Sequence, residues 1–98
     1  MPAWFYVLRL HSGGLYVGAT TNLERRLREH RAGTACRATA GDPPVGLVYS
    51  ERHESFGAAR RRETQVKRWT RAKKEALVAG DVQQLKRLAR SHQKRKQP

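Results

Sequence analysis

The sequence is poor in several features, and each shortage narrows the class of protein. Cys36 is the only cysteine among 98 residues, which excludes an internal disulfide and a zinc site built from cysteines. No apolar run approaches the roughly 20 residues that a membrane-spanning helix needs. The apolar stretch 1–10 is short and lacks the basic start of a secretory signal. These shortages predict a reduced, cytoplasmic protein without a membrane segment.

Acidic residues are also scarce, which indicates the kind of partner. The chain has 21 Lys and Arg against 8 Asp and Glu, a formal net charge of +13. Such an excess favours a polyanionic partner. On charge alone, DNA, RNA and an anionic membrane surface are all candidates. The length fits one domain, which we place at residues 1–90, followed by a basic, disordered tail at 91–98.

The N-terminal region predicts a β-hairpin. Residues 4–10 and 15–20 are rich in the aromatic and β-branched side chains that favour strands. A three-residue loop over 12–14, with its last glycine in the left-handed conformation, fits the sequence between them. This loop length places Tyr6 and Tyr16 on the same face of the sheet, because side chains alternate along a strand.

The remaining pattern predicts one more strand and several helices. A capping box at 21–24 predicts a helix start, and Gly33 predicts its end. Residues 34–44 are expected to form a loop and residues 45–52 a third strand. Further helices are expected from Ser55 as N-cap to about residue 69, from residue 70 or 71 to about 80, and from Asp81 as N-cap to about 89.

Polar residues occupy helix positions where the pattern expects apolar ones. Arg26 and His30 lie on the stripe of the first helix that also carries leucines, and Glu63 lies on the inner stripe of a later helix. Taken singly, each has an ordinary explanation, such as a surface ion pair of Glu63 with Arg60 or Lys67. Functional sites are nevertheless where such local rules are expected to fail.

Together these residue types suit the hydrolysis of a phosphodiester. Glu63 offers the oxygen ligand that Mg²⁺ or Mn²⁺ prefers. Arg26 offers a bidentate fork to a phosphate. A tyrosine near a metal and an arginine loses its proton more easily and can act as base toward water, with His30 to orient it.

Several segments, the last of them Lys73-Lys74-Glu75-Ala76-Leu77, resemble the GIY-YIG nuclease superfamily over about residues 3–79. Within it the chain is similar to small stand-alone bacterial members related to the N-terminal module of the UvrC repair nuclease. The other segments are Trp4-Phe5-Tyr6, Leu15-Tyr16-Val17-Gly18, the run from Asn22 to His30, and Arg60-Arg61-Arg62-Glu63 followed by Val66-Lys67-Arg68-Trp69.

The resemblance implies a role for each candidate residue. Tyr6 matches the tyrosine that ends the first motif, and Tyr16 matches the tyrosine that some members use as general base. Arg26 matches the phosphate-binding arginine, His30 a histidine found in some branches, and Glu63 the metal-ligating glutamate.

The resemblance also implies a fold and an activity. The fold is α+β, a small three-stranded antiparallel sheet flanked by helices, which agrees with the predicted order of elements. The activity is that of a Mg²⁺- or Mn²⁺-dependent endonuclease acting on DNA, in repair or processing. Arg25 is the second candidate for the phosphate-binding arginine. The alternative is a non-catalytic, basic DNA- or RNA-binding module on the same fold.

Overall fold

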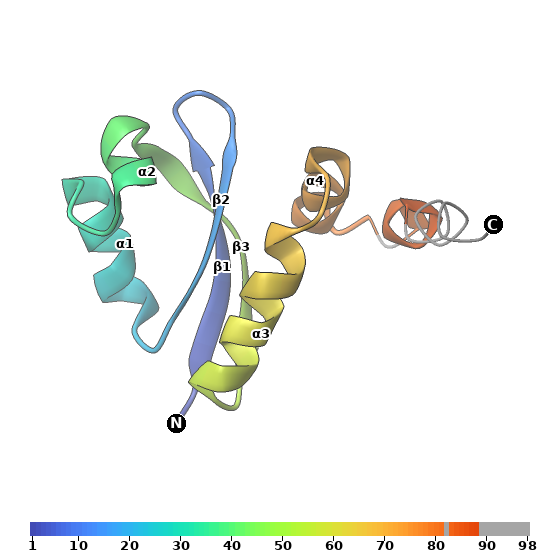
Figure 1. Cartoon of the computed structure of the whole chain (residues 1–98), viewed down its shortest axis with the longest axis horizontal. Coiled ribbons are helices and arrows are strands. Elements are labelled where there is room, and N and C mark those ends of the chain that lie inside the picture. Colours follow the sequence, from blue (N-terminus) through green and yellow to red (C-terminus); the bar gives the residue numbers. More distant parts are fainter. Residues whose placement is uncertain (82, 89–98) are drawn as a thin grey trace. The chain divides into compact units, whose positions relative to one another are not determined.

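A three-stranded antiparallel sheet lies at the centre of the first part of the chain (Figure 1). The computed structural model describes residues 1–81 and 83–88. The strands are β1 (Ala3–Leu10), β2 (Leu15–Thr20) and β3 (Pro44–His53), in the order β2-β1-β3. This sheet with its helices confirms the predicted α+β fold.

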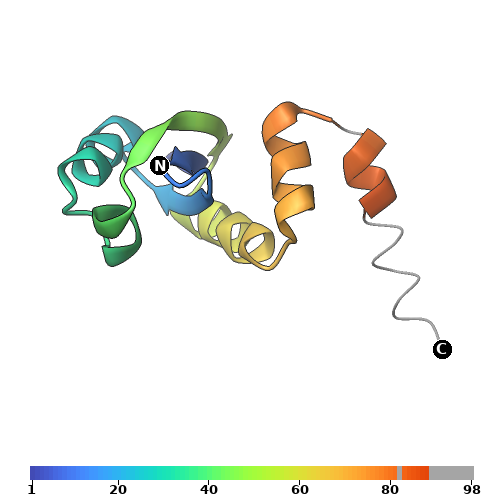
Figure 2. The same ribbon diagram turned by 90° about the horizontal axis from the view of Figure 1, so that it is seen from above.

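Helices cover both faces of the sheet. Helix α1 (Leu23–Ala32) lies on one face together with the short helix α2 (Arg37–Gly41), and α3 (Phe56–Lys67) lies on the other (Figures 1 and 2). Leu23 and Leu27 of α1 pack on a buried cluster formed by alternate residues of β1, namely Tyr6, Leu8 and Leu10. The intervening residue Phe5 faces α3, where the guanidinium of Arg62 lies 5.9 Å from its ring centre.

The hairpin loop has the predicted length but lies one residue earlier than expected. It spans residues 11–13, because the amide of Leu10 donates to the carbonyl of Gly14 (2.9 Å) and the amide of Gly13 donates back to the carbonyl of Leu10 (2.9 Å). The left-handed glycine is therefore Gly13 (φ 92°) and not Gly14. Either glycine satisfies the loop, so the sequence alone does not choose between them.

The loop length still places the two tyrosines on one face. Tyr6 is paired with Gly18 across the hairpin, and Leu8 is paired with Tyr16. Directly paired residues point to the same side of a sheet, and so do residues two apart on a strand. The Tyr6 and Tyr16 rings accordingly lie 6.4 Å apart, centre to centre.

Helix α1 begins one residue later than the predicted capping box. The side chain of Asn22, and not that of Thr21, accepts a hydrogen bond from the amide of Arg25 (3.0 Å). The helix ends as predicted at Gly33, which is left-handed (φ 77°). Asparagine caps helices at least as well as threonine, which explains why two adjacent candidates were hard to distinguish.

The expected loop at 34–44 contains helix α2, so this prediction was wrong. The helix is only five residues long. It is too short to show a periodic pattern in the sequence, which is the signal that identifies helices. Its residue Thr39 is fully buried.

Helix α3 begins at the predicted cap, where the Ser55 hydroxyl accepts from the amide of Ala58 (3.2 Å). It ends at Lys67, two residues before the predicted end. Its buried stripe is formed by Ala59, Glu63 and Val66.

The described residues from Trp69 to residue 88 form a second compact unit. Helix α4 (Arg71–Ala79) is capped at its start by Thr70 and at its end by the left-handed Gly80 (φ 70°), as predicted. Asp81 caps a further helical segment at 83–88, its side chain accepting from an amide at residue 84 (3.0 Å). The predicted tail at 91–98 lies outside the described residues. Within residues 1–81 and 83–88, no helix is long and apolar enough to cross a membrane.

Candidate active site

A buried hydrogen bond joins β1 to α1. The Tyr6 hydroxyl lies 2.7 Å from Nε2 of His30, and both side chains are shielded from solvent, with residue exposures of 1% and 0%. The other ring nitrogen of His30, Nδ1, lies 2.9 Å from the Thr39 hydroxyl on α2. A chain of three polar side chains therefore crosses from the sheet through α1 to α2.

The charge state of His30 determines which hydrogen bonds these three side chains can form. Burial lowers the pKa of the imidazole, and the nearby positive charge of Arg26 lowers it further. The ring is therefore neutral at neutral pH, with one donor and one acceptor nitrogen. The flanking hydroxyls of Tyr6 and Thr39 can each donate or accept, so they satisfy both ring nitrogens in either tautomer.

Arg26 lies at the edge of this buried group. Its side chain is 33% exposed and forms an ion pair with Glu29 at 3.2 Å. Burial opposes its charge, but hydrogen bonds with Tyr6 and Glu29 outweigh that effect and raise the pKa of Arg26. Arg25 is exposed on the same helix, and its backbone amide is held by the helix cap. Arg26 is therefore the arginine in contact with the tyrosine.

Helix α3 contributes a carboxylate, that of Glu63. Its side chain is only 8% exposed, and its two oxygens accept from Arg60 (3.2 Å) and Lys67 (3.3 Å). Both partners are themselves more than half exposed. The two ion pairs considered from the sequence both exist, but the carboxylate that they hold is buried. Its negative charge helps to raise the pKa of Tyr6, which places it within electrostatic range of that phenol.

Tyr16 completes the group and is more accessible than Tyr6. Its ring centre lies 5.0 Å from that of His30, and the residue is partly exposed. Burial strongly raises the pKa of Tyr16, and a hydrogen bond with the Cys36 thiol adds to the effect. The positive charge of Arg26 lowers this pKa as expected from the sequence, but it is the weaker influence. In the protein alone, Tyr16 therefore keeps its proton at neutral pH.

Two further residues shape the site. Gly18 faces the Tyr6 ring so closely that a Cβ at this position would lie 2.5 Å from the Tyr6 hydroxyl oxygen. Only glycine leaves room for the ring. The sequence shows the glycine in the Tyr-Val-Gly segment, but it does not show why a glycine is needed at that position. Thr39 was missed because its helix was missed, and a lone threonine in a presumed loop carries no signal.

Among residues 1–81 and 83–88, no cluster of three or more His, Cys, Asp or Glu side chains could hold a metal ion. Glu63 is a single buried carboxylate. It fits a hard divalent ion whose other positions are filled by water and phosphate oxygens. Its present partners, Arg60 and Lys67, are long exposed side chains that can turn into solvent at little cost, since exposed ion pairs stabilise by about 1 kcal/mol or less.

Comparison with known proteins shows which family the chain is similar to. The family model described as the GIY-YIG catalytic domain matches residues 2–76. The chain is 49% identical over 79 residues to a UPF0213 protein of Natronomonas pharaonis, covering 81% of this chain and 93% of that protein. It is 41% identical over 76 residues to a UPF0213 protein of Streptococcus sanguinis, covering 78% and 87%.

A solved structure shows the same likeness. The solution NMR structure of a UPF0213 protein from Bacillus halodurans superimposes with a TM-score of 0.54 at 36% identity, covering 83% of this chain and 86% of that one. The names of these relatives state no activity.

Proposed function

The chain belongs to the GIY-YIG catalytic-domain family, and on this premise we propose that it is a metal-dependent endonuclease that hydrolyses phosphodiester bonds in DNA, in repair or processing. The observation that carries the proposal is the buried carboxylate of Glu63 on α3, beside a sheet whose Tyr6 also interacts with Arg26 of α1. The charges of Arg26 and Glu63 both influence the pKa of Tyr6. A phosphate-binding cation and a metal-binding carboxylate around one phenol suit this reaction.

Arg26 binds the phosphate at the point of cleavage. A guanidinium donates two parallel hydrogen bonds to phosphate oxygens and keeps its charge at any physiological pH. The interaction with Tyr6 raises the pKa of Arg26, and the exposed third of the side chain remains within reach of the substrate. Tyr6 thus positions Arg26, and His30 and Thr39 hold Tyr6 in turn.

Glu63 is the residue that holds the divalent ion, Mg²⁺ or Mn²⁺. When bound, such an ion stabilises the charge that develops on the phosphate and favours the ionised form of nearby phenols. Glu63 is suited to this role because its carboxylate is buried on a helix, while its competing partners, Arg60 and Lys67, are exposed side chains at the surface.

Tyr16 is the general base. In its ionised form Tyr16 takes a proton from a water molecule, and the water oxygen forms a bond to phosphorus. The ester bond to the leaving oxygen breaks, and that oxygen takes a proton from solvent. The products are a phosphate monoester and a free hydroxyl group. Tyr16 is preferred to Tyr6 for this role because Tyr6 is closed off from solvent, whereas Tyr16 is partly exposed.

A cleavage panel tests the proposal. Labelled single-stranded, duplex, flap and junction DNAs are incubated with Mg²⁺ or Mn²⁺ and with wild-type protein, Glu63→Ala or Arg26→Ala. We expect cleavage of at least one DNA by the wild type only, with all three proteins equally folded. Equal cleavage by the wild type and Glu63→Ala after rigorous purification would reject the proposal.

The net charge of +13 favours a second candidate function, a DNA- or RNA-binding module without catalysis. Residues 69–98 alone hold nine Lys or Arg against two Asp or Glu. This function predicts binding with a steep salt dependence, log K falling with a slope of roughly −0.9 per neutralised phosphate on duplex DNA. Such binding in the absence of cleavage with either metal would favour it over the endonuclease.

A further inference from the structure

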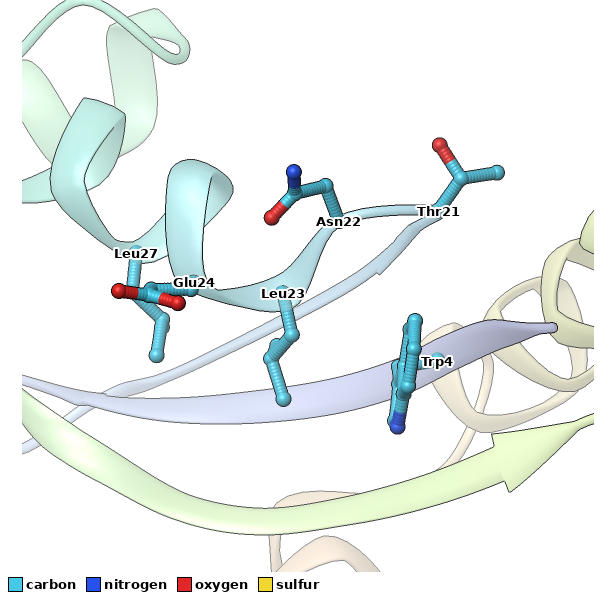
Figure 3. Close-up of a pocket in the computed structure, with 6 residues that line it drawn as sticks. All are labelled: Trp4, Thr21, Asn22, Leu23, Glu24 and Leu27. Carbon is cyan, nitrogen blue, oxygen red and sulfur yellow. The ribbon is translucent and has the colours of Figure 1, made fainter.

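A pocket of about 590 Å³ opens between β1 and the start of α1, next to the candidate active site (Figure 3). Six residues line it: Trp4, Thr21, Asn22, Leu23, Glu24 and Leu27. Leu23 and Leu27 point from α1 toward the sheet, and Trp4 stands on β1 beside them. The size lies within the range of about 300–1,000 Å³ typical of small-molecule sites.

The pocket shares its walls with the active site. Trp4 lies two residues before Tyr6 on the same face of β1. Leu23 and Leu27 also pack against the cluster that contains Tyr6. A group seated in the pocket therefore lies against side chains that also pack around Tyr6, one of the candidate site residues.

The lining indicates a flat, uncharged occupant. The indole of Trp4 and two leucine side chains form apolar walls, which suit a planar ring. The polar residues of the lining are Thr21, Asn22 and Glu24. The Asn22 oxygen caps α1, and the exposed Glu24 carboxylate at the rim pairs with Arg28 at 3.3 Å, so the walls that face Trp4 are mainly apolar.

Two arginines near the pocket, Arg52 and Arg26, can contact the phosphates on either side of a nucleotide seated there. Arg52 of β3 is paired directly with Trp4 and so lies on the same face of the sheet. Its side chain is 57% exposed, and its ion pair with Glu54 lies at the surface, where it stabilises little. Arg26 lies on the other side, one helical turn after Leu23 on α1.

We propose that this pocket binds an unpaired nucleobase next to the cleaved phosphate, so that the substrate is single-stranded DNA or a single-stranded segment of a larger DNA. The proposal rests on the proposed function, because it adds a base site to the same nuclease. A base within an intact duplex is stacked and paired, and it cannot enter without being flipped out. Stacking of bases on aromatic side chains is the common way in which proteins hold single strands without reading their sequence.

The test uses the intrinsic fluorescence of Trp4. The full-length Trp69→Phe protein has Trp4 as its sole tryptophan. It is titrated with a single-stranded oligonucleotide, with an abasic oligonucleotide of equal length, and with a duplex, all in EDTA so that no cleavage occurs. We expect strong quenching by the single strand and weak quenching by the abasic strand and the duplex. Absence of quenching by the single strand, or equal quenching by the duplex, overturns the proposal.

Affinity provides the second measurement. Trp4→Leu keeps an apolar side chain but removes the stacking surface, and we expect it to weaken single-strand binding about tenfold while abasic binding is unchanged. Phe56→Leu, which changes an exposed ring on α3, is the matched control and should change neither affinity. Equal losses for both strands would reject a base site. Because binding is measured without metal, quenching without any later cleavage would reject only the nuclease, and cleavage without quenching would reject only the pocket.

Discussion

The Tyr6 hydroxyl and Nε2 of His30 lie 2.7 Å apart in the interior of the protein, and the opposite nitrogen of His30 contacts the Thr39 hydroxyl at 2.9 Å. The pair links the first strand to the helix that carries Arg26. Because both ends of the imidazole have partners, the ring is fixed, and so is the phenol that hydrogen-bonds Arg26.

Thr39→Val removes the hydroxyl and keeps the shape of the side chain. It leaves Nδ1 of His30 buried without its partner, which we expect to lower the free energy of unfolding by about 1–3 kcal/mol. If His30 positions Tyr6, the cleavage rate should also fall while affinity for DNA is kept. Thr39→Ser restores the hydroxyl and should recover the rate. Loss of stability without any loss of rate would leave Thr39 a purely structural residue.

Gly18→Ala tests the close approach of β2 to the Tyr6 ring. The added Cβ would lie 2.5 Å from the hydroxyl oxygen and 2.6 Å from the ring carbon that carries it. We expect displacement of the ring and a loss of about 1–3 kcal/mol in the free energy of unfolding. Gly46→Ala on β3 is the matched control, since a Cβ there meets no atom within 4 Å. Equal stability of the two variants in urea denaturation would contradict the geometry.

His30 makes stability depend on pH. Burial and the charge of Arg26 lower its folded-state pKa below the unfolded value of about 6.5, with Glu29 opposing them and the phenols of Tyr6 and Tyr16 uncharged in this range. As the pH falls, His30 therefore takes up a proton in the unfolded state before it does so in the folded state. The contribution of neutral His30 to the free energy of unfolding is complete above about pH 6.5. It is lost as the pH falls through the folded-state pKa, by up to about 1.4 kcal/mol per pH unit.

Urea denaturation between pH 7.5 and 5 measures this dependence. His30→Gln lacks the titrating group and should show a flatter profile over the same interval. The same slope in the wild type and the variant would show that His30 is not the group responsible.

Tyr16 predicts the pH dependence of cleavage. Because its pKa is raised, only a small fraction is ionised at neutral pH, and that fraction grows about tenfold per pH unit. The rate under single-turnover conditions should therefore rise with pH up to the alkaline limit of protein stability. Tyr16→Phe should lose far more rate than affinity. A loss of affinity alone would assign Tyr16 to binding or structure.

The sequence predicted the elements that have strong local signals. The β-rich stretches around Tyr6 and Tyr16, the cap at Ser55 and the glycine stop at Gly33 all appear in the structure. The shared face of the two tyrosines followed from loop length alone, even though the loop itself lies one residue away. These features depend on near neighbours in the chain, which a sequence displays directly.

What the sequence did not predict depends on distant contacts. Thr39 is buried because it meets His30, nine residues away, and its five-residue helix has no periodicity of its own. The raised pKa of Tyr16 reflects burial by the whole fold, which the charge of Arg26 alone could not indicate. The pocket beside Trp4 likewise requires the strand and the helix to be brought together.

The central claim is that Glu63 makes cleavage depend on a metal ion. The direct measurement is the single-turnover cleavage rate of a labelled single strand as a function of Mn²⁺ concentration, for the wild type, Glu63→Gln and the surface control Glu54→Gln. We predict that the wild type and Glu54→Gln saturate at the same rate, and that Glu63→Gln is slower by about a hundredfold or more at every concentration. Cleavage by Glu63→Gln at the wild-type rate and with the wild-type metal dependence would contradict the claim.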